Sequence, residues 1–83
     1  MNQTVILGIR ISDRLGEAGR VQSILTKYGC TIRTRLGLHD VDAEYVSPAG
    51  LIILELAGDP AEYLKLENEL TGLDGVTVRK MEF

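Results

Sequence analysis

Two polar stretches hold most of the residues of this chain whose side chains could do chemistry. The first reads SDRLG and begins at Ser12, and the second reads HDVDAE and begins at His39. Neither stretch contains a glycine-rich phosphate loop or the sharp turn that exposes a catalytic serine. No Ser or Cys is placed to act as a nucleophile beside His39, the one histidine of the chain. We therefore expect no catalytic residue and no enzyme activity.

Metal binding is the next chemistry to test, because the second stretch holds His39, Asp40, Asp42 and Glu44. The one cysteine, Cys30, is expected at the far end of the same strand, about 30 Å from His39 at ~3.3 Å per residue. A lone histidine among loop carboxylates lacks the paired spacing of a zinc site, and the glycine and glutamate of a calcium loop do not fall in place. We expect a solvated acidic loop, with no metal ligand and no cofactor. A metal-responsive domain stays open as an alternative.

The first stretch has the composition of a ligand-binding turn at the start of a helix. Free backbone N–H groups and partial positive charge there suit an anion or a polar ligand. Gly16 allows close approach of a ligand, and Arg14 and Arg20 add charge. Asp13, Arg14, Gly16, Arg20 and His39 are therefore the candidate ligand-binding residues. In the alternative interpretation Asp13 only caps the helix or forms a salt bridge, Gly16 only forms the turn, and Arg20 is solvated.

Composition limits the class of protein. The 83 residues suffice for one domain, taken as 1–83, and the contents of 45% hydrophobic and 25% charged residues are those of a soluble globule. The net charge of −3 gives no basic surplus for direct nucleic-acid binding. No apolar run is long enough for a bilayer, and the amino terminus does not read as a signal peptide. With its single cysteine, the chain is expected in the cytoplasm.

Hydrophobic periodicity predicts the elements that position these stretches. Alternation predicts strands over 4–11, 30–38, 51–57 and 76–83. Helical spacing predicts one helix over 16–28, closed by a left-handed Gly29, and a second one from an Asp59 cap to about Gly72. The segment 39–50 is expected to be a long hairpin loop. The order βαββαβ predicts a ferredoxin-like α+β fold, in which a four-stranded antiparallel sheet carries both helices on one face. The 12–16 turn and the 39–49 loop then lie at the same end of the sheet.

Alternation also divides the strand residues between a helix-covered face and an open face. The helix-covered set is Val5, Leu7, Ile9, Ile11, Ile32, Leu36, Ile52, Leu54, Leu56, Val76 and Val78. The open set is Ile6, Arg10, Arg33, Arg35, Leu51, Ile53, Glu55, Arg79, Met81 and Phe83.

Large apolar side chains together with arginine are more typical of protein interfaces than of free surface. We therefore expect a homo-oligomer, at least a dimer. The expected interface residues are Ile6, Arg33, Arg35, Leu51, Ile53 and Met81. A wet face with scattered hydrophobic residues is the alternative. RNA reading would need aromatic platforms that the inner strands lack.

The motif DRLG at 13–16, the apolar helix that follows and the run GCTI at 29–32 resemble the opening of ACT domains. Those domains are small βαββαβ regulatory modules that dimerise and bind amino acids or other effectors. In this chain Leu15 replaces the usual proline, and Glu17 replaces the usual apolar residue after the glycine.

Over nearly the whole chain the segments ILGIRISDR, RTRLGLHDV, AGLIILELAGD and LDGVTVRKMEF resemble the small regulators assigned to iron-only hydrogenase systems. That family is akin to ACT domains and to the effector domain of nickel-responsive repressors. The resemblance implies a transcriptional or regulatory role without naming a ligand. It leaves open a pure homo-oligomerisation domain and a metal-responsive domain.

Overall fold

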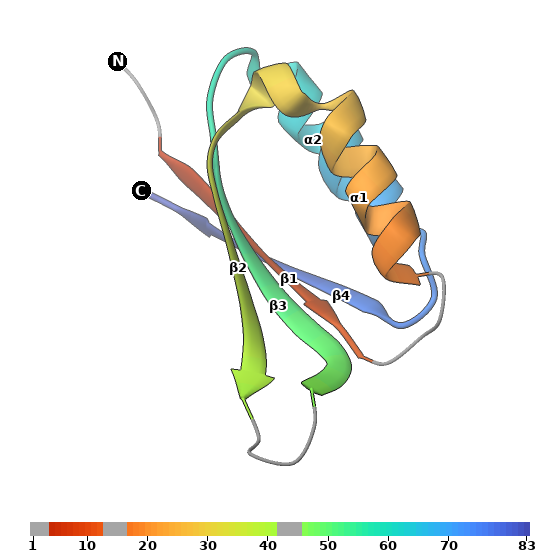
Figure 1. Cartoon of the computed structure of the whole chain (residues 1–83). Helices are drawn as coiled ribbons and strands as arrows, with labels where there is room; N and C mark the ends of the chain where they lie inside the picture. The colour runs from red at the N-terminus through yellow and green to blue at the C-terminus, as the bar shows by residue number, and fades with distance from the viewer. Residues whose placement is uncertain (1–3, 13–16, 42–45) are drawn as a thin grey trace.

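In this computed structural model a four-stranded sheet carries both helices on one face (Figure 1). The structure describes residues 4–12, 17–41 and 46–83, and for Ala18, 38–41 and 46–49 the backbone alone. The elements are β1 (Val5–Ile11), α1 (Glu17–Lys27), a 3-10 turn η1 (Gly29–Thr31), β2 (Ile32–Val41), β3 (Val46–Leu56), α2 (Pro60–Thr71) and β4 (Val76–Glu82). The strand order is β2-β3-β1-β4, and every neighbouring pair is antiparallel. The predicted ferredoxin-like βαββαβ fold is confirmed.

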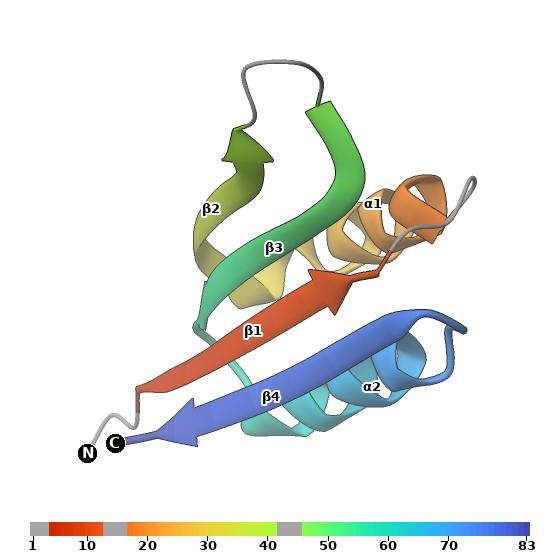
Figure 2. The same cartoon turned by 90° about the horizontal axis from the view of Figure 1, so that it is seen from below.

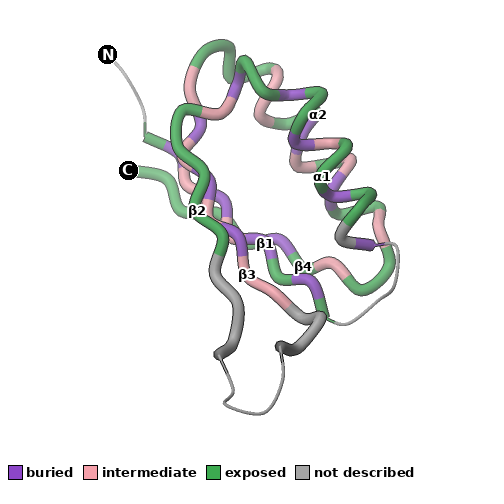
Figure 3. The backbone as a smooth tube through the Cα atoms, in the orientation of Figure 1, coloured by how far each residue is buried: buried purple, intermediate pink, exposed green. Residues whose placement is uncertain are grey.

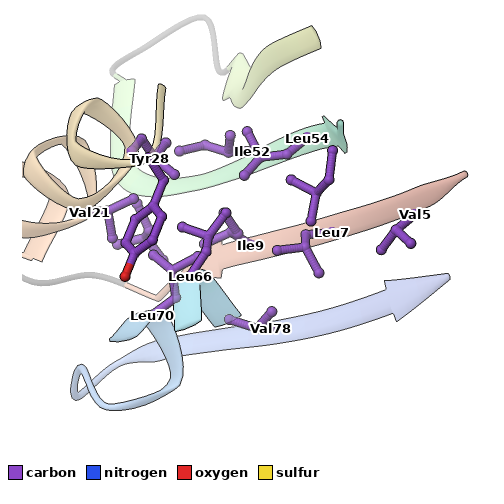
Figure 4. Close-up of a cluster of buried hydrophobic side chains, with 13 residues drawn as sticks. Val5, Leu7, Ile9, Val21, Tyr28, Ile52, Leu54, Leu66, Leu70 and Val78 are labelled. Carbon is purple, nitrogen blue, oxygen red and sulfur yellow. The ribbon is translucent and has the colours of Figure 1, made fainter. Parts of the chain in front are cut away.

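The core fills the space between the sheet and the two helices, as the buried positions along the tube in Figure 3 show. Alternate residues of β1 are buried, because one face of this inner strand lies under the helices. Leu66 and Leu70 of α2 are fully buried against the sheet, and Val21 of α1 lies beside them (Figure 4). Leu25 of α1 belongs to the same core. The helices therefore cover the face that the alternation of β1 predicts.

The start of α2 follows the predicted capping chemistry. The Asp59 carboxylate oxygen Oδ1 accepts a hydrogen bond from the N–H of Ala61 at 2.9 Å, and Pro60 opens the helix. The helix ends at Thr71, next to the predicted Gly72.

The prediction of a left-handed Gly29 at the end of α1 is wrong. Among the described glycines only Gly58 and Gly75 have positive φ. Instead, the chain continues from α1 through the 3-10 turn η1, in which the Thr31 N–H donates to the Tyr28 carbonyl. The tighter turn thus replaces the left-handed cap.

The long hairpin loop predicted over 39–50 is shorter than expected. Strand β2 continues to Val41 and β3 begins at Val46, so the pair forms a ribbon that projects beyond the rest of the sheet (Figures 1 and 2). The register shifts between His39 and Val41, in the part of the ribbon where β3 contains Pro48. Proline cannot donate a hydrogen bond to the neighbouring strand, but it is tolerated where the register is irregular. A polar segment that contains proline can therefore still form part of a strand.

A β-bulge near the start of β2 changes which face its residues occupy. Ile32 pairs with Leu56 and Thr34 with Glu55, so two steps along β2 match one step along β3. Arg33 is the extra residue, and it is exposed. Because side chains alternate with a period of two, the extra residue reverses the faces of residues 34–37 of β2.

Two face predictions are wrong for this reason. Leu36, expected under the helices, pairs with Ile53 and is 53% exposed on the open face. Arg35, expected on the open face, pairs with Leu54 on the helix side. There its guanidinium group donates a hydrogen bond to Gln22 of α1. Arg35 therefore does not belong to the open face.

No helix in the described part of the chain is long and apolar enough to cross a membrane.

Candidate functional site

The predicted ligand-binding residues lie around the end of β1, and the structure describes only some of them. Asp13, Arg14 and Gly16 lie outside the described residues. Arg20 is an exposed residue of α1. His39 is placed by its backbone, which lies in β2 and pairs with Gly50 of β3.

The strand register brings His39 to the same end of the sheet as the start of α1. Gly50 pairs with His39 on one side and with Ile11, the last residue of β1, on the other. The His39 backbone is therefore about two strand spacings, or ~10 Å, from the end of β1. At this end the N–H of Ser12 also donates to the carbonyl of Gly75 at 2.8 Å, which joins the end of β1 to the turn before β4.

The first residue of α1 is a buried acid. The Glu17 side chain is only 9% exposed. Its Oε1 is 3.1 Å from Nη1 of Arg20, one helical turn further along. Its Oε2 is buried and has no hydrogen-bond partner among the residues that the structure describes. A buried acceptor without a donor costs about 1–3 kcal/mol, more when it is charged, so this oxygen is an unusual feature of the fold.

The sequence interpretation treated Glu17 only as a departure from the ACT pattern. The signal that predicts its burial is its spacing, because Glu17 precedes the buried Val21 by four residues and shares its side of the helix. An unpaired carboxylate oxygen at this position accepts hydrogen bonds from an ammonium, an amine or an amide N–H. The N-terminal N–H groups of α1 offer complementary donors to an anionic group.

The open face of the sheet is a second candidate surface. Cross-strand pairing arranges its residues in rows, and in the central row Leu36, Ile53, Gly8 and Arg79 lie side by side. One neighbouring row runs Thr34, Glu55, Ile6, Met81, and the other includes Leu51, Arg10 and Thr77. Leu36 and Met81 are more than half exposed, and Ile6, Leu51 and Ile53 are half-buried. The face is thus mainly apolar, with a few charges.

The charged groups of the open face are poorly satisfied within the chain. In the described part of the structure the Arg10 guanidinium has no hydrogen-bond or ion-pair partner. That of Arg79 donates only to the carbonyl of Val78. Glu55 accepts from the hydroxyl of Thr34 at 3.1 Å through Oε1. Arginine beside apolar side chains is typical of surfaces that bind another protein.

A small groove of ≈ 160 Å³ lies between α2 and the sheet, at the end where β1 begins. Val5, Leu7 and Leu56 line it together with Tyr63 and the exposed Leu64. Because α1 starts at the other end of β1, this groove is separate from the Glu17 region.

The helices are linked by a polar cluster on the outer side of the core. The hydroxyl of Tyr28 and Nζ of Lys27 both donate to Oε2 of Glu69, Lys27 at 2.9 Å. The hydrogen bond from Tyr28, together with that from Lys27, lowers the pKa of the Glu69 carboxyl. The same hydrogen bond and the burial of the phenol raise the pKa of Tyr28.

Within residues 4–12, 17–41 and 46–83, no three His, Cys, Asp or Glu side chains are grouped so that they could hold a metal ion. Cys30 is exposed in η1.

Comparisons with known proteins support the fold. No protein-family model matches the chain, and no curated protein matches it in sequence. Among solved structures, an uncharacterized protein of Thermotoga maritima is similar over 99% of both chains, with 24% identity and a TM-score of 0.81. The ACT domain of a GTP pyrophosphokinase of Chlorobium tepidum matches 94% of this chain and 96% of its own, with 16% identity and a TM-score of 0.66. A dimeric ferredoxin-like protein from an uncultured marine organism covers 98% of this chain and 92% of its own, at 7% identity and a TM-score of 0.50.

Proposed function

We propose that this chain is a small non-catalytic regulatory module that binds an effector at the start of α1 and works as a homo-oligomer. The observation that carries the proposal is the buried Oε2 of Glu17 in the first turn of that helix, which has no partner within the described part of the chain. Folding an acceptor into the interior without a donor is unfavourable, and such a group calls for an explanation, of which a role in binding is one. A ligand that supplies the missing donor removes the penalty.

The effector class follows from the groups around Glu17. Its carboxylate suits an ammonium, amine or amide donor, and the N–H groups of the helix start suit a carboxylate or a phosphate on the same molecule. A small zwitterion such as an amino acid combines both. Asp13, Arg14, Gly16, Arg20 and His39 remain the proposed ligand-binding residues, and the shared end of the sheet supports this grouping.

The finer form of the proposal is transcriptional or regulatory control, because the sequence resembles regulators assigned to iron-only hydrogenase systems. The net charge of −3 argues against direct contact with nucleic acid, so any DNA contact would come from a partner chain. Likeness in fold to the ACT domain of an enzyme supports a regulatory module rather than a catalyst.

Thermal-shift screening tests the effector proposal. The unmodified protein is melted with each of the 20 L-amino acids, with nucleotides and with divalent metal salts. A ligand at a hundredfold excess over its dissociation constant stabilises by ~2.7 kcal/mol, which is easily detected as a rise in melting temperature.

Two variants then locate the site. Glu17→Gln keeps the size of the side chain but removes its charge, so it should abolish most of the response to a cationic or zwitterionic ligand. Glu62→Gln is the matched control, because Glu62 forms the equivalent i,i+3 ion pair with Lys65 in the first turn of α2. A ligand that stabilises Glu17→Gln as strongly as the unmodified protein would refute the assignment of this site.

A pure assembly domain without a ligand is the second candidate, and the apolar open face favours it. It predicts a stable oligomer and no thermal response to any compound of the panel. A metal-responsive domain is the third alternative, and it predicts a response to the metal salts alone.

A further inference from the structure

We infer that two copies of this chain stack through their open sheet faces, with Arg10 of each copy paired to Glu55 of the other. The inference rests on the homo-oligomer of the proposed function and goes further by naming the surface, the symmetry and the charge pair. It starts from three observations on the face: an exposed apolar centre, an arginine without a partner among the described residues, and one carboxylate on the neighbouring strand.

The apolar centre of the open face is stabilised when another apolar surface buries it. Ile6, Leu51 and Ile53 are half-buried, and Leu36 and Met81 are more than half exposed. A second copy presents the same side chains, so two faces satisfy each other about a two-fold axis, the commonest symmetry of small oligomers. The centre of the face is flat, because Gly8 has no side chain and Ile53 Cδ1 lies only 3.9 Å from the position that a Gly8 Cβ would occupy.

The charges select one stacking geometry. Arg10 and Glu55 lie diagonally on neighbouring strands, since Glu55 pairs with Ile6, four residues before Arg10 on β1. The diagonal spans one strand spacing of ~4.8 Å across and ~13.6 Å along the strands, which inclines it by about 19° to the strand direction. A two-fold axis in the plane between the faces, perpendicular to this diagonal, places Glu55 of each copy opposite Arg10 of the other.

This axis also crosses the two sheets at an angle that sheets adopt in proteins. The strands of the two copies cross at twice the inclination, about 40°, close to the roughly 30° of aligned sheet packing. When the connection from β1 through α1 to β2 is right-handed, the strands of one copy are rotated relative to those of the other in the same negative sense as in aligned sheet packing. Ile53 falls near the axis and contacts its own symmetry mate. Leu51 falls over the region of Leu36 and Thr34 of the other copy.

In this arrangement the charged groups of the two faces lie opposite groups of the other sign. In its own chain Glu55 accepts through Oε1 from Thr34, and Arg10 has no partner among the described residues. Stacking gives two identical ion pairs beside an apolar contact, where they are less screened than on a free surface. Arg79 lies on the edge strand β4, at one end of the axis and away from its centre, and stays at the rim.

The size of the face sets the expected affinity. Four strands at ~4.8 Å spacing and a strand length of about 24 Å give a projected area of roughly 450 Å² per copy. That is at the lower end for specific interfaces, so we expect a dimer with a dissociation constant in the micromolar range.

Charge reversal with mixing tests the pair directly, with sedimentation velocity over a concentration series as the measurement. Arg10→Glu and Glu55→Arg each place like charges opposite one another twice in the dimer, so each alone should weaken dimerisation about tenfold or more. An equimolar mixture restores both ion pairs, one in each half, so it should dimerise within a few-fold of the unmodified protein. Arg79→Glu is the same-face control. Its mixture with Glu55→Arg keeps one Arg10–Glu55 pair and one like-charge contact, so it should recover clearly less than the mixture of Arg10→Glu with Glu55→Arg.

The outcomes separate this inference from the proposed function. Circular dichroism first confirms that each variant is folded, and Arg10→Gln and Glu55→Gln replace any reversal variant that is not. A monomeric unmodified protein at 100 µM, roughly a hundredfold above a low-micromolar dissociation constant, overturns the homo-oligomer and the inference together. Suppose instead that the unmodified protein dimerises, while the mixture of Arg10→Glu with Glu55→Arg shows no recovery, or while the mixture of Arg79→Glu with Glu55→Arg recovers equally well. In either case the Arg10–Glu55 pairing is wrong while the homo-oligomer stands.

Discussion

Replacing Glu17 by leucine should make the unliganded protein more stable. The substitution removes a side chain that is 9% exposed and whose buried Oε2 has no partner in residues 4–12, 17–41 and 46–83. The leucine side chain is one bond shorter, and it extends the apolar side of α1 that carries Val21. Replacing Glu17 should therefore raise the stability of the unliganded protein while it removes the proposed binding group.

The expected gain is a difference between one favourable and two unfavourable changes. Removing the unpaired oxygen raises the free energy of unfolding by about 1–3 kcal/mol. Loss of the i,i+3 ion pair to Arg20, whose side chain is 68% exposed, costs only about 0.2–0.5 kcal/mol. Loss of an acid from the first turn of the helix costs a further 0.3–1 kcal/mol or so. The balance is a stabilisation of about 1 kcal/mol, which raises the melting temperature of a domain of this size by roughly 4–8 °C.

Thermal and urea denaturation followed by circular dichroism measure the effect. Glu62→Leu is the matched control, because Glu62 has the same i,i+3 geometry at 3.1 Å in the first turn of α2 but is 37% exposed. It loses the favourable contacts without relieving a buried group, so its melting temperature should fall. Equal shifts for the two variants, or destabilisation by Glu17→Leu, would refute the reasoning that the unpaired oxygen of Glu17 is costly.

Three further predictions test other parts of the molecule. Asp59→Ala should cost about 0.5–2 kcal/mol of unfolding free energy through loss of the cap to the Ala61 N–H, and an unchanged urea midpoint would contradict it. Ile53→Glu, which places two carboxylates near the proposed two-fold axis, should give a monomer in light scattering; a dimer of unchanged mass would exclude the open face as the interface. Tyr28→Phe should flatten the dependence of stability on pH. The lowered pKa of Glu69 gives stability that is present above pH 4.5 and lost below it, and the raised pKa of Tyr28 gives stability that is lost above pH 10.0. Stability curves that coincide at both ends would show that the hydrogen bond is not formed.

Local patterns determined much of the fold. The alternation of β1, the capping residues Asp59 and Pro60 and the helical spacing around Val21 each act within a few residues, so they can be read in order along the chain. Their order fixed the topology, and the topology placed His39 at the same end of the sheet as the start of α1.

Contacts between distant segments decided the rest. The bulge at Arg33 is set by the pairing of β2 with β3, more than twenty residues away, and no local pattern marks the extra residue. It moved Leu36 to the open face and Arg35 to the helix side, which changed the composition of the proposed interface. The burial of Glu17 likewise depends on what packs around α1. Alternation along the sequence shows which residues share a face of a strand. Which of the two faces lies under the helices is set by pairing with the neighbouring strand. The sequence therefore predicted the strands, and only the tertiary structure decided their faces.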